Sequence, residues 1–358
     1  MPDSPDHFPL FAEFPALATA VPRLRLGNWP TPVESAHDFA RENGLNSLWI
    51  KREDLSHPLA GGNKVRGLEF LLADARGRGS KSILTLSSVG SHHICKTAWH
   101  ARQINLDSTA IVVPQPPQPY VAANLCSELA SGTQLIPASF LTALPRLIAA
   151  WMRLKAGGRA PLYIAPGGTS PLACIGHVNA AFELREQIDA GLMPAPDFLY
   201  VPMGSLGTAA GLSLGCALTG LKTTIVGVAV SFRWYCTPGR CRRIAFRTLR
   251  LLRSHAAVPY ASPNEIRVVN SVLGSGYAEV TEGGREWAGK WQATGGPRLD
   301  TTYAAKALHG AMEFIRDNRL QEKVHLFWHT YHEMPAPGDP AALAAELPPA
   351  LRKYIQII

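Results

Sequence analysis

Lys64 is the residue of this chain best placed for covalent chemistry. It follows Gly61, Gly62 and Asn63 and comes directly before an amphipathic run at residues 65–75. An amine at the entrance of a helix can be reached by a ligand while burial withholds part of its hydration. Such a lysine loses part of its preference for the charged form and can attack a carbonyl carbon. The spacing therefore indicates a nucleophilic lysine, although a surface lysine at a helix start has the same local sequence.

A glycine-rich segment at residues 204–208 is the second candidate for ligand binding. Small residues let backbone N–H groups converge on an anion, and the positive end of a following helix favours negative charge. The spacing matches neither the P-loop nor the dinucleotide fingerprint, so ATP and dinucleotides are disfavoured. Glycines that only permit close packing at a strand-to-helix turn are the alternative. The predicted phosphate cradle consists of Gly204, Ser205, Leu206, Gly207 and Thr208.

Ser91, His92 and His93 are the third candidate segment. They stand where a helix is expected to begin, so a hydroxyl and backbone N–H groups are available to hold a carboxylate. His92, His93 and Cys95 are also potential metal ligands, but a fourth ligand with zinc spacing is missing. The same alternative applies to two further histidines, His329 and His332.

These three segments together supply the groups that a pyridoxal-phosphate enzyme acting on an amino acid needs. The lysine forms a Schiff base with the cofactor, the glycine-rich segment holds its phosphate, and the third segment holds the substrate carboxylate. The cofactor supplies the electron sink for the reaction. We therefore predict pyridoxal 5'-phosphate as the cofactor and an amino acid as the substrate, with no bound metal.

Short β-branched runs alternate with helical stretches, which predicts parallel sheets with helices on their faces. Ligands bind at the carboxyl ends of strands in such folds, and residues 87–93, 204–208 and 329–332 each follow an expected strand. The proline-rich residues 114–119 predict a rigid loop. Strands are expected at residues 47–51, 82–87, 108–113, 162–165, 198–201, 223–229 and 324–328, and helices at 66–76, 95–103, 171–190 and 304–317.

Size and composition agree with a two-domain enzyme. The chain has 358 residues, 46% hydrophobic and 17% charged, which is enough to bury a large core. No apolar run reaches the roughly 18 residues that span a membrane. The first twenty residues contain Asp3, Asp6 and Glu13 but no Lys or Arg, unlike a secretory signal or transit peptide. We expect a cytoplasmic protein with six reduced cysteines, and a Cys236–Cys241 bridge or metal site is the alternative.

The formal net charge is +8, and much of it comes from a run of arginines with interleaved apolar residues. This spacing predicts an amphipathic helix with a basic outer face, which would attract nucleic acid or another anionic partner. No nucleic-acid-reading motif stands beside it. We therefore expect a solvated helix or a subunit contact, and no nucleic-acid partner. The arginines are Arg233, Arg240, Arg242, Arg243, Arg247, Arg250 and Arg253.

The motifs around these residues resemble the fold-type II pyridoxal-phosphate enzymes, specifically the D-cysteine desulfhydrase and aminocyclopropane-carboxylate deaminase group. The likeness extends from about residue 24 to residue 330. Residues 51–55 (KREDL) and 61–66 (GGNKVR) are similar to a rather specific motif pair of that group, and residues 204–208 to its GSGGT phosphate loop. Further similar segments are residues 167–171, 276–277, 299–303 and 306–307.

The resemblance implies a role for each matched residue. Lys64 is expected to hold the cofactor, with Asn63 beside it and the Thr330 hydroxyl against the pyridine nitrogen. Ser91 is expected to face the substrate, and Tyr303 to act as an acid or base near the α-carbon. Gly168 and Thr169, in a turn that borders the substrate pocket, and His92 and His93 complete the residues expected to bind substrate.

Four departures from the family pattern lie around the expected cofactor and substrate. His92 occupies the position of an asparagine expected against the cofactor's ring oxygen. Leu206 replaces a glycine of the phosphate loop, and Tyr331 and His332 replace a pair of glycines. Ala304 stands where the deaminases have a glutamate that faces the pyridine nitrogen, so opening of an aminocyclopropane ring is not expected.

The expected reaction is α,β-elimination from D-cysteine or another β-substituted amino acid, which gives ammonia and a 2-oxo acid. Lys64 or Tyr303 is expected to remove the α-proton, and His92 either to protonate the leaving group or only to bind the cofactor. β- or γ-Replacement, another tailoring step, and a catalytically silent protein that binds cofactor or amino acid are the alternatives.

The resemblance also implies a homodimer whose subunits have a two-domain, three-layer αβα fold of the α/β class, similar to tryptophan synthase β. We expect a large cofactor-binding domain from residues 1–64 and 181–358. A small, mobile domain from residues 65–180 is expected to close over the site and exclude water.

Overall fold

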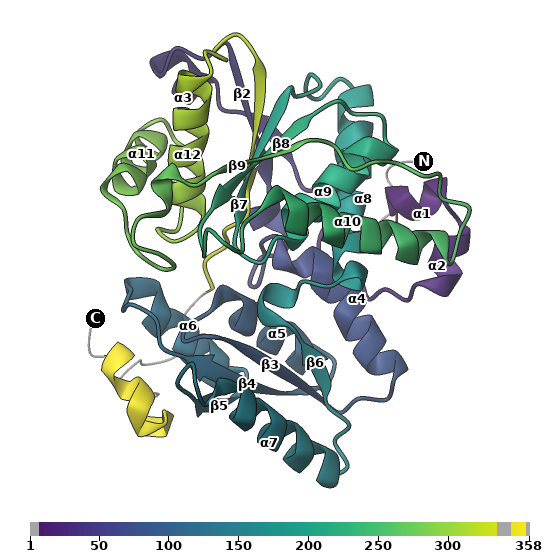
Figure 1. Ribbon diagram of the computed structural model, residues 1–358, viewed down its shortest axis with the longest axis vertical. Coiled ribbons are helices and arrows are strands. Elements are labelled where there is room, and N and C mark those ends of the chain that lie inside the picture. Colours follow the sequence, from purple (N-terminus) through teal and green to yellow (C-terminus); the bar gives the residue numbers. More distant parts are fainter. Residues whose placement is uncertain (1–6, 335–344, 356–358) are drawn as a thin grey trace.

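Two sheets organise the chain, one in each of two lobes (Figure 1). The computed structural model describes residues 7–334 and 345–355, so Asp3 and Asp6 of the acidic amino terminus lie outside the described residues. All strand pairs are parallel except β1 (Val33–Ser35) with β2 (Ser47–Arg52). The expected α/β fold with parallel-rich sheets is therefore confirmed.

The larger sheet has six strands, and its inner strands are nearly continuous apolar runs. Such runs are typical of parallel strands that are buried on both faces. Its order is β1-β2-β10-β7-β8-β9, where β10 is Val324–His329, β7 is Phe198–Met203, β8 is Thr224–Ala229 and β9 is Ile266–Val269.

Helices cover both faces of the larger sheet. One apolar cluster joins a face to α1 (Pro9–Glu13), α2 (Ala16–Ala20), α8 (Pro171–Asp189), α9 (Gly207–Leu218) and α10 (Pro238–Arg253). A second cluster joins the other face to α3 (His37–Glu42), α11 (Glu282–Ala293) and α12 (Ala304–Asp317). The lobe thus has three layers.

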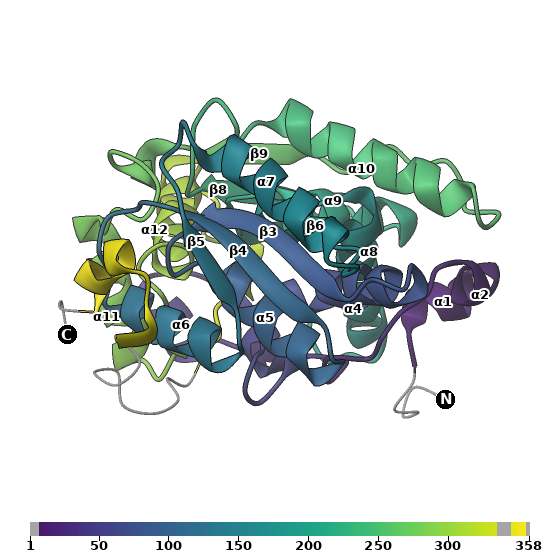
Figure 2. The same ribbon diagram turned by 90° about the horizontal axis from the view of Figure 1, so that it is seen from below.

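The smaller sheet has four parallel strands in the order β5 (Gln134–Pro137), β4 (Asp107–Val113), β3 (Ser82–Ser88) and β6 (Leu162–Ile164). Helix α7 (Ala143–Ala156) packs on one face. Helices α4 (Lys64–Gly77), α5 (His92–Gln103) and α6 (Pro119–Ala130) cover the other face (Figure 2). Short 3-10 helices are η1 (Glu53–Ser56), η2 (Pro166–Gly168), η3 (Ser271–Leu273) and η4 (Pro349–Tyr354).

Two segments pack across the lobes. The carboxyl-terminal η4 lies beside α6, where Leu351 and Tyr354 join the apolar cluster of the smaller sheet (Figures 1 and 2). Tyr354 Oη donates a hydrogen bond of 3.1 Å to the Gln115 carbonyl. Helix α8 packs in the core of the larger lobe, through residues such as Ile175 and Val178. The domain boundaries at residues 64 and 180 stay a prediction.

Each expected strand and helix is present, and the observed ends differ from the expected ones by at most three residues. The arginine-rich helix is α10, and its arginines are exposed; Arg233, which was expected in this helix, lies before it. The strands β1, β5 and β9 were not predicted from the sequence. The same holds for η4.

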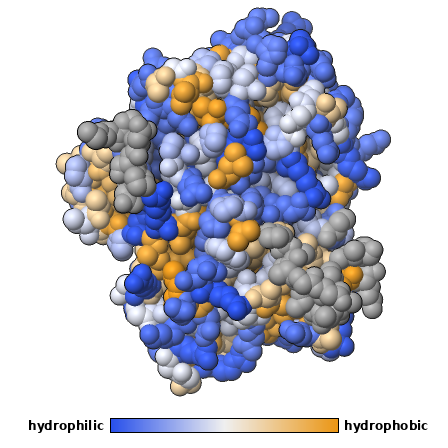
Figure 3. Space-filling view, turned by 180° about the vertical axis from the view of Figure 1, so that it is seen from behind, coloured by the Kyte–Doolittle hydropathy of each residue, from blue (hydrophilic) through white to orange (hydrophobic). Residues whose placement is uncertain are grey.

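Among the helices of the described residues, none is both long and apolar enough to cross a bilayer. All six cysteines are buried free thiols, so the alternative of a Cys236–Cys241 bridge is not realised. The molecule seen from behind is largely hydrophilic, with hydrophobic residues in several separate groups (Figure 3).

Candidate active site

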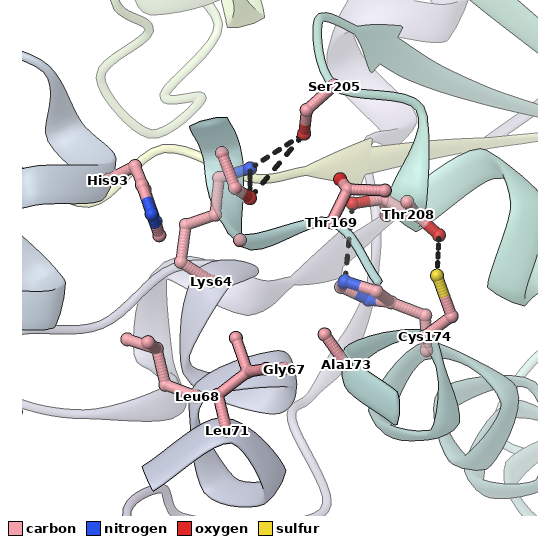
Figure 4. A pocket seen from close by; sticks show the side chains of 14 residues that line it. Lys64, Gly67, Leu68, Leu71, His93, Thr169, Ala173, Cys174, Ser205 and Thr208 are labelled. Atoms are coloured by element: carbon pink, nitrogen blue, oxygen red, sulfur yellow. Dashed lines mark hydrogen bonds between the residues drawn. The ribbon is translucent and has the colours of Figure 1, made fainter. Parts of the chain in front are cut away.

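Lys64 lies at the first position of α4, where segments of both lobes meet. Its Nζ atom is 3.1 Å from the Gly167 carbonyl oxygen and 3.5 Å from Ser205 Oγ (Figure 4). Burial lowers the pKa of Lys64 to about 8, because the ammonium form loses hydration. An amine with this pKa is partly uncharged near neutral pH, which suits attack on a carbonyl carbon.

The predicted phosphate cradle joins β7 to α9 beside this amine. Leu206 has a φ of 71°, in the left-handed region that favours glycine. The first helical bond of α9 runs from the Ala210 N–H to the Leu206 carbonyl. The amides before it have no acceptor within the helix and are available to an anion. Asn63 Nδ2 donates to Thr208 Oγ1 at 2.8 Å, which ties the cradle to the lysine's own turn.

The surroundings of the amine fit a phosphate-bearing ligand. A Cβ atom at Gly207 would lie 2.9 Å from Thr169 Oγ1, and one at Gly168 would lie 3.0 Å from His93 Cε1, so glycine keeps this surface open. Nε2 of His92 and Nε2 of His93 are buried without a hydrogen-bond partner among the described residues. Since buried polar atoms normally have partners, the amine, the loop amides and these ring nitrogens fit pyridoxal phosphate.

Ser91 caps α5. Its Oγ atom accepts a hydrogen bond from the His93 N–H at 3.3 Å and lies 3.0 Å from Ser87 Oγ. His92 and His93 follow in the first turn. Burial, with a smaller effect of nearby lysine charge, lowers the pKa of each ring to about 3. Both rings are therefore neutral near pH 7, and a neutral imidazole can donate one hydrogen bond.

Tyr303 directly precedes α12, and Asp300 fixes its turn by accepting from the Tyr303 N–H at 2.8 Å. Its Oη atom donates to Tyr277 Oη at 2.8 Å, and Ser88 Oγ donates to the same oxygen at 3.3 Å. Burial raises the pKa of Tyr303 well above its usual value. The hydroxyl is therefore protonated at neutral pH. A Cβ atom at Gly204 would lie 3.0 Å from the Tyr303 ring, so this side chain borders the cradle.

Thr330 follows β10 and lies against the turn that contains Lys64. Its carbonyl oxygen accepts from the Asn63 N–H at 3.4 Å. Lys96 Nζ, on α5, donates to the His332 carbonyl oxygen at 2.8 Å. Helix α5 of the smaller lobe therefore contacts the first residues after β10, at His332.

The predicted residues fall into two adjoining groups. Ser91, His92, Tyr303 and Thr330 lie outside the pocket that Figure 4 shows, and the His92 and Tyr303 rings are 6.5 Å apart. Asn63, Gly204 and Leu206 also lie outside its lining, next to residues that line it. The predicted residues that line this pocket are Lys64, His93, Gly168, Thr169, Ser205, Gly207 and Thr208.

Lys51, Glu53 and Arg66 of the KREDL and GGNKVR motifs form a buried ion network with Glu183, outside the pocket. Lys51 Nζ lies 2.6 Å from Glu183 Oε1. Arg66 contacts Glu53 Oε1 at 2.7 Å and Glu183 Oε2 at 3.0 Å. This network joins β2, η1 and α8 to the first turn of α4. It therefore fixes the backbone that positions Lys64.

Metal ligation finds no support in residues 7–334 and 345–355, where no group of three or more His, Cys, Asp and Glu residues could hold an ion. Cys95 Sγ donates instead to the Asn124 carbonyl at 3.2 Å. His332 Nδ1 lies 2.8 Å from the Asp54 carbonyl oxygen. These side chains therefore have structural partners.

Sequence reasoning did not single out Tyr120, Asn124 or His177, which the structure brings to the site. The Tyr120 ring stacks on the His92 ring, with centroids 4.9 Å apart. Asn124 Nδ2 is 3.0 Å from His92 Nδ1, and His177 Nε2 is 3.4 Å from Thr208 Oγ1. Tyr120 and Asn124 are four residues apart and share one face of α6, but nothing in their local sequence indicates a ligand.

The chain is similar to known proteins over most of its length. A family model described as pyridoxal-phosphate dependent enzyme matches residues 24–330. The chain is 32% identical over 345 residues to nocardicin C-9' epimerase of Nocardia uniformis subsp. tsuyamanensis, covering 94% of this chain and 99% of that protein. It is 29% identical over 329 residues to D-cysteine desulfhydrase of Salmonella paratyphi B, covering 87% and 94%.

A solved structure gives the same picture. The crystal structure of an ACC deaminase homologue superposes with a TM-score of 0.78 at 28% sequence identity, covering 95% of this chain and all of that chain. Both lobes are therefore common to the two proteins.

Proposed function

Because the chain belongs to the pyridoxal-phosphate-dependent enzyme family, we propose that it is an amino-acid lyase. The proposed reaction is α,β-elimination: the α-proton leaves, a β-substituent such as the thiol of D-cysteine is expelled, and water completes the products, ammonia and a 2-oxo acid. The observation that supports it most is the buried Lys64 amine beside the glycine-rich cradle.

Pyridoxal phosphate, when bound, supplies the electron sink that makes the α-proton acidic. Lys64 would hold its aldehyde carbon, and the amides of residues 204–208 would hold its phosphate. Asn63 would fix the lysine's turn against Thr208, as its 2.8 Å hydrogen bond indicates. His92 and Thr330 would contact the ring.

The protonation state of each side chain determines which of them can take up or give a proton. Lys64, with a pKa of about 8, can take up a proton near neutral pH. Tyr303 keeps its proton, because burial raises the pKa of its hydroxyl. We therefore assign Lys64 as the base. Tyr303 donates its hydroxyl hydrogen to Tyr277, which Ser88 also contacts, so it would act as a donor to the substrate only after its O–H turns away from Tyr277.

The substrate carboxylate is assigned to the first turn of α5. Ser91 presents a hydroxyl and His92 a backbone amide at the positive end of a twelve-residue helix, because the N–H groups of Ser91 and His93 already donate to the Ser88 carbonyl oxygen and Ser91 Oγ. Gly168, Thr169 and the His93 side chain line the adjoining pocket that contains Lys64.

Epimerisation at an α-carbon is the second candidate. Its support is the 32% identity to an epimerase over nearly the whole chain. The same first step, removal of an α-proton, serves both reactions. They differ in whether a substituent leaves or the proton returns to the opposite face.

A substrate screen in deuterium oxide separates the candidates. Elimination predicts release of ammonia and a 2-oxo acid from D-cysteine or another β-substituted amino acid. Epimerisation predicts inverted amino acid with α-deuterium and no ammonia. Product that forms only with an added nucleophile indicates replacement, and cofactor binding with neither product nor exchange indicates a silent binder. Either of these last two results contradicts the lyase proposal.

His92→Asn restores the family's amide and tests the origin of specificity. An unchanged substrate profile would contradict a role of His92 in redirecting the substrate choice. A cytoplasmic homodimer remains part of the proposal, and light scattering of the purified protein tests the dimer.

A further inference from the structure

A neighbouring residue on α6 determines which ring nitrogen of His92 accepts a hydrogen bond. Asn124 Nδ2 donates to the Gly90 carbonyl oxygen at 2.8 Å and lies 3.0 Å from His92 Nδ1. A carbonyl oxygen only accepts, so this end of the Asn124 amide must be the NH₂ group. Its second hydrogen then points to His92 Nδ1, which must accept.

The proton of the neutral His92 ring is therefore on Nε2. A proton on Nδ1 would face an N–H of Asn124, and two donors at 3.0 Å repel. Reversing the Asn124 amide would instead place its oxygen against the Gly90 oxygen. His92 Nε2 is buried and has no hydrogen-bond partner in the described part of the chain, so a donor is left for a ligand.

The His92 ring is also held in orientation. Tyr120 stacks on it at 4.9 Å with an interplanar angle of 27°, and Tyr331 meets it edge-on at 5.3 Å. The Tyr120 hydroxyl is itself fixed, 2.9 Å from Thr302 Oγ1 and 3.2 Å from Gln115 Nε2. Rotation of the ring would break the stack and the bond to Asn124 together.

We propose that Asn124 and Tyr120 are positioning residues that fix His92 as an Nε2–H donor to an anionic oxygen of the bound ligand. This rests on the proposed function, because the oxygen belongs either to the pyridine ring of the cofactor or to the carboxylate of the amino acid. It also explains the departure from the family: Asn124 makes a histidine present the N–H that an amide would present.

Nitrogen-15 NMR of histidine side chains in the cofactor-loaded protein tests the tautomer directly. The His92 signals are assigned by their loss in His92→Asn. We expect a pyrrole-type Nε2 and a pyridine-type Nδ1 in the wild type, and a mixture of tautomers in Asn124→Leu. A wild-type His92 with its proton on Nδ1 would overturn the proposal. This readout does not depend on which lysine holds the cofactor, so its failure is distinct from failure of the proposed function.

Two further readouts identify the acceptor. If it is the cofactor's ring oxygen, Asn124→Leu raises the pH midpoint of the cofactor's absorption change by about one unit without any amino acid, because an anion loses a donor. If it is the substrate carboxylate, the absorption is unchanged and the apparent Kd of 2-aminoisobutyrate, which has no α-proton, rises about tenfold.

Tyr120 variants separate positioning from simple stability. Tyr120→Phe keeps the stacked ring. It should match the wild type in the pH midpoint of the cofactor's absorption and in the Kd of 2-aminoisobutyrate. Tyr120→Leu should shift the same readout as Asn124→Leu. Variants that lower only the melting temperature, with the NMR signals, absorption and Kd of the wild type, would contradict the positioning role. If Asn124→Leu does not fold, Tyr120→Leu and the wild-type NMR spectrum still test whether His92 is held with its proton on Nε2.

Discussion

Lys51 and Glu183, 132 residues apart, form a buried ion pair of 2.6 Å that links strand β2 to helix α8. Glu183 also contacts Arg66, two residues beyond Lys64. Burial alone would raise the pKa of Glu183, but Arg66 and Lys51 hold it down at about 2. Lys51 and Arg66, from the motifs around Lys64, therefore contribute by stabilising the folded protein.

Glu183→Gln should lower the free energy of unfolding by about 3 kcal/mol, because it leaves two buried cations short of a partner. The ionised carboxylate stabilises the folded state above its usual pKa, and this contribution is lost as pH falls from about 4.5 towards 2. The variant should therefore show a flatter pH dependence there. Denaturant unfolding across that range measures both effects.

A matched control is the exposed pair of Arg185 and Asp189 on the same helix, 2.8 Å apart. Arg185→Ala should leave the unfolding midpoint unchanged, because exposed ion pairs contribute little. Equal losses for the two variants would contradict a special role of the buried network.

Leu206→Gly should destabilise the protein even though it restores the glycine of the family loop. Relief of the left-handed backbone contributes about 1–2 kcal/mol. Loss of a buried leucine side chain costs about 2–5 kcal/mol, and glycine adds unfolded-state entropy. A net loss of about 1–3 kcal/mol is expected in thermal or denaturant unfolding. A variant more stable than the wild type would show that backbone strain outweighs packing at this position.

The rate at which the cofactor-free protein binds pyridoxal phosphate covalently should rise with pH and level off above a midpoint near 8. Only the uncharged amine attacks the aldehyde, and burial lowers the pKa of Lys64 to about 8. Stopped-flow absorbance at a series of pH values measures the midpoint. A midpoint near 10.5, the ordinary lysine value, would mean that Lys64 is fully hydrated.

Tyr303→Phe should reduce kcat by about 10²–10⁴-fold with a smaller change in KM, because it removes a protonated hydroxyl next to the cradle. Tyr277→Phe should have a weaker effect, since that hydroxyl acts through Tyr303. Steady-state rates and exchange of the α-proton with solvent measure both. Full activity of Tyr303→Phe would remove this residue from the reaction.

Local patterns predicted the fold and the motifs well, for reasons visible in particular residues. The run at β8 reports its own burial, so this strand was evident. The helix α4 was predicted as an amphipathic run, but residues 65–73 and 75 are all buried, because α4 packs on several elements whose positions the local pattern does not show. The glycines before Lys64 marked the turn. The role of Asn124 was not evident, because it depends on two contacts, with Gly90 and His92, that only the packing of α6 on α5 creates. The ion network could not be predicted from the sequence for the same reason, since Glu183 lies far along the chain from Lys51.

Borohydride reduction of the cofactor-loaded protein, followed by peptide mass spectrometry, shows directly which lysine holds the cofactor. We expect a single pyridoxyl group on the peptide that contains Lys64, and its loss in Lys64→Ala while Lys96→Ala retains it. A label on Lys96 or another lysine, or no label in protein that binds the cofactor, would contradict the assignment of Lys64.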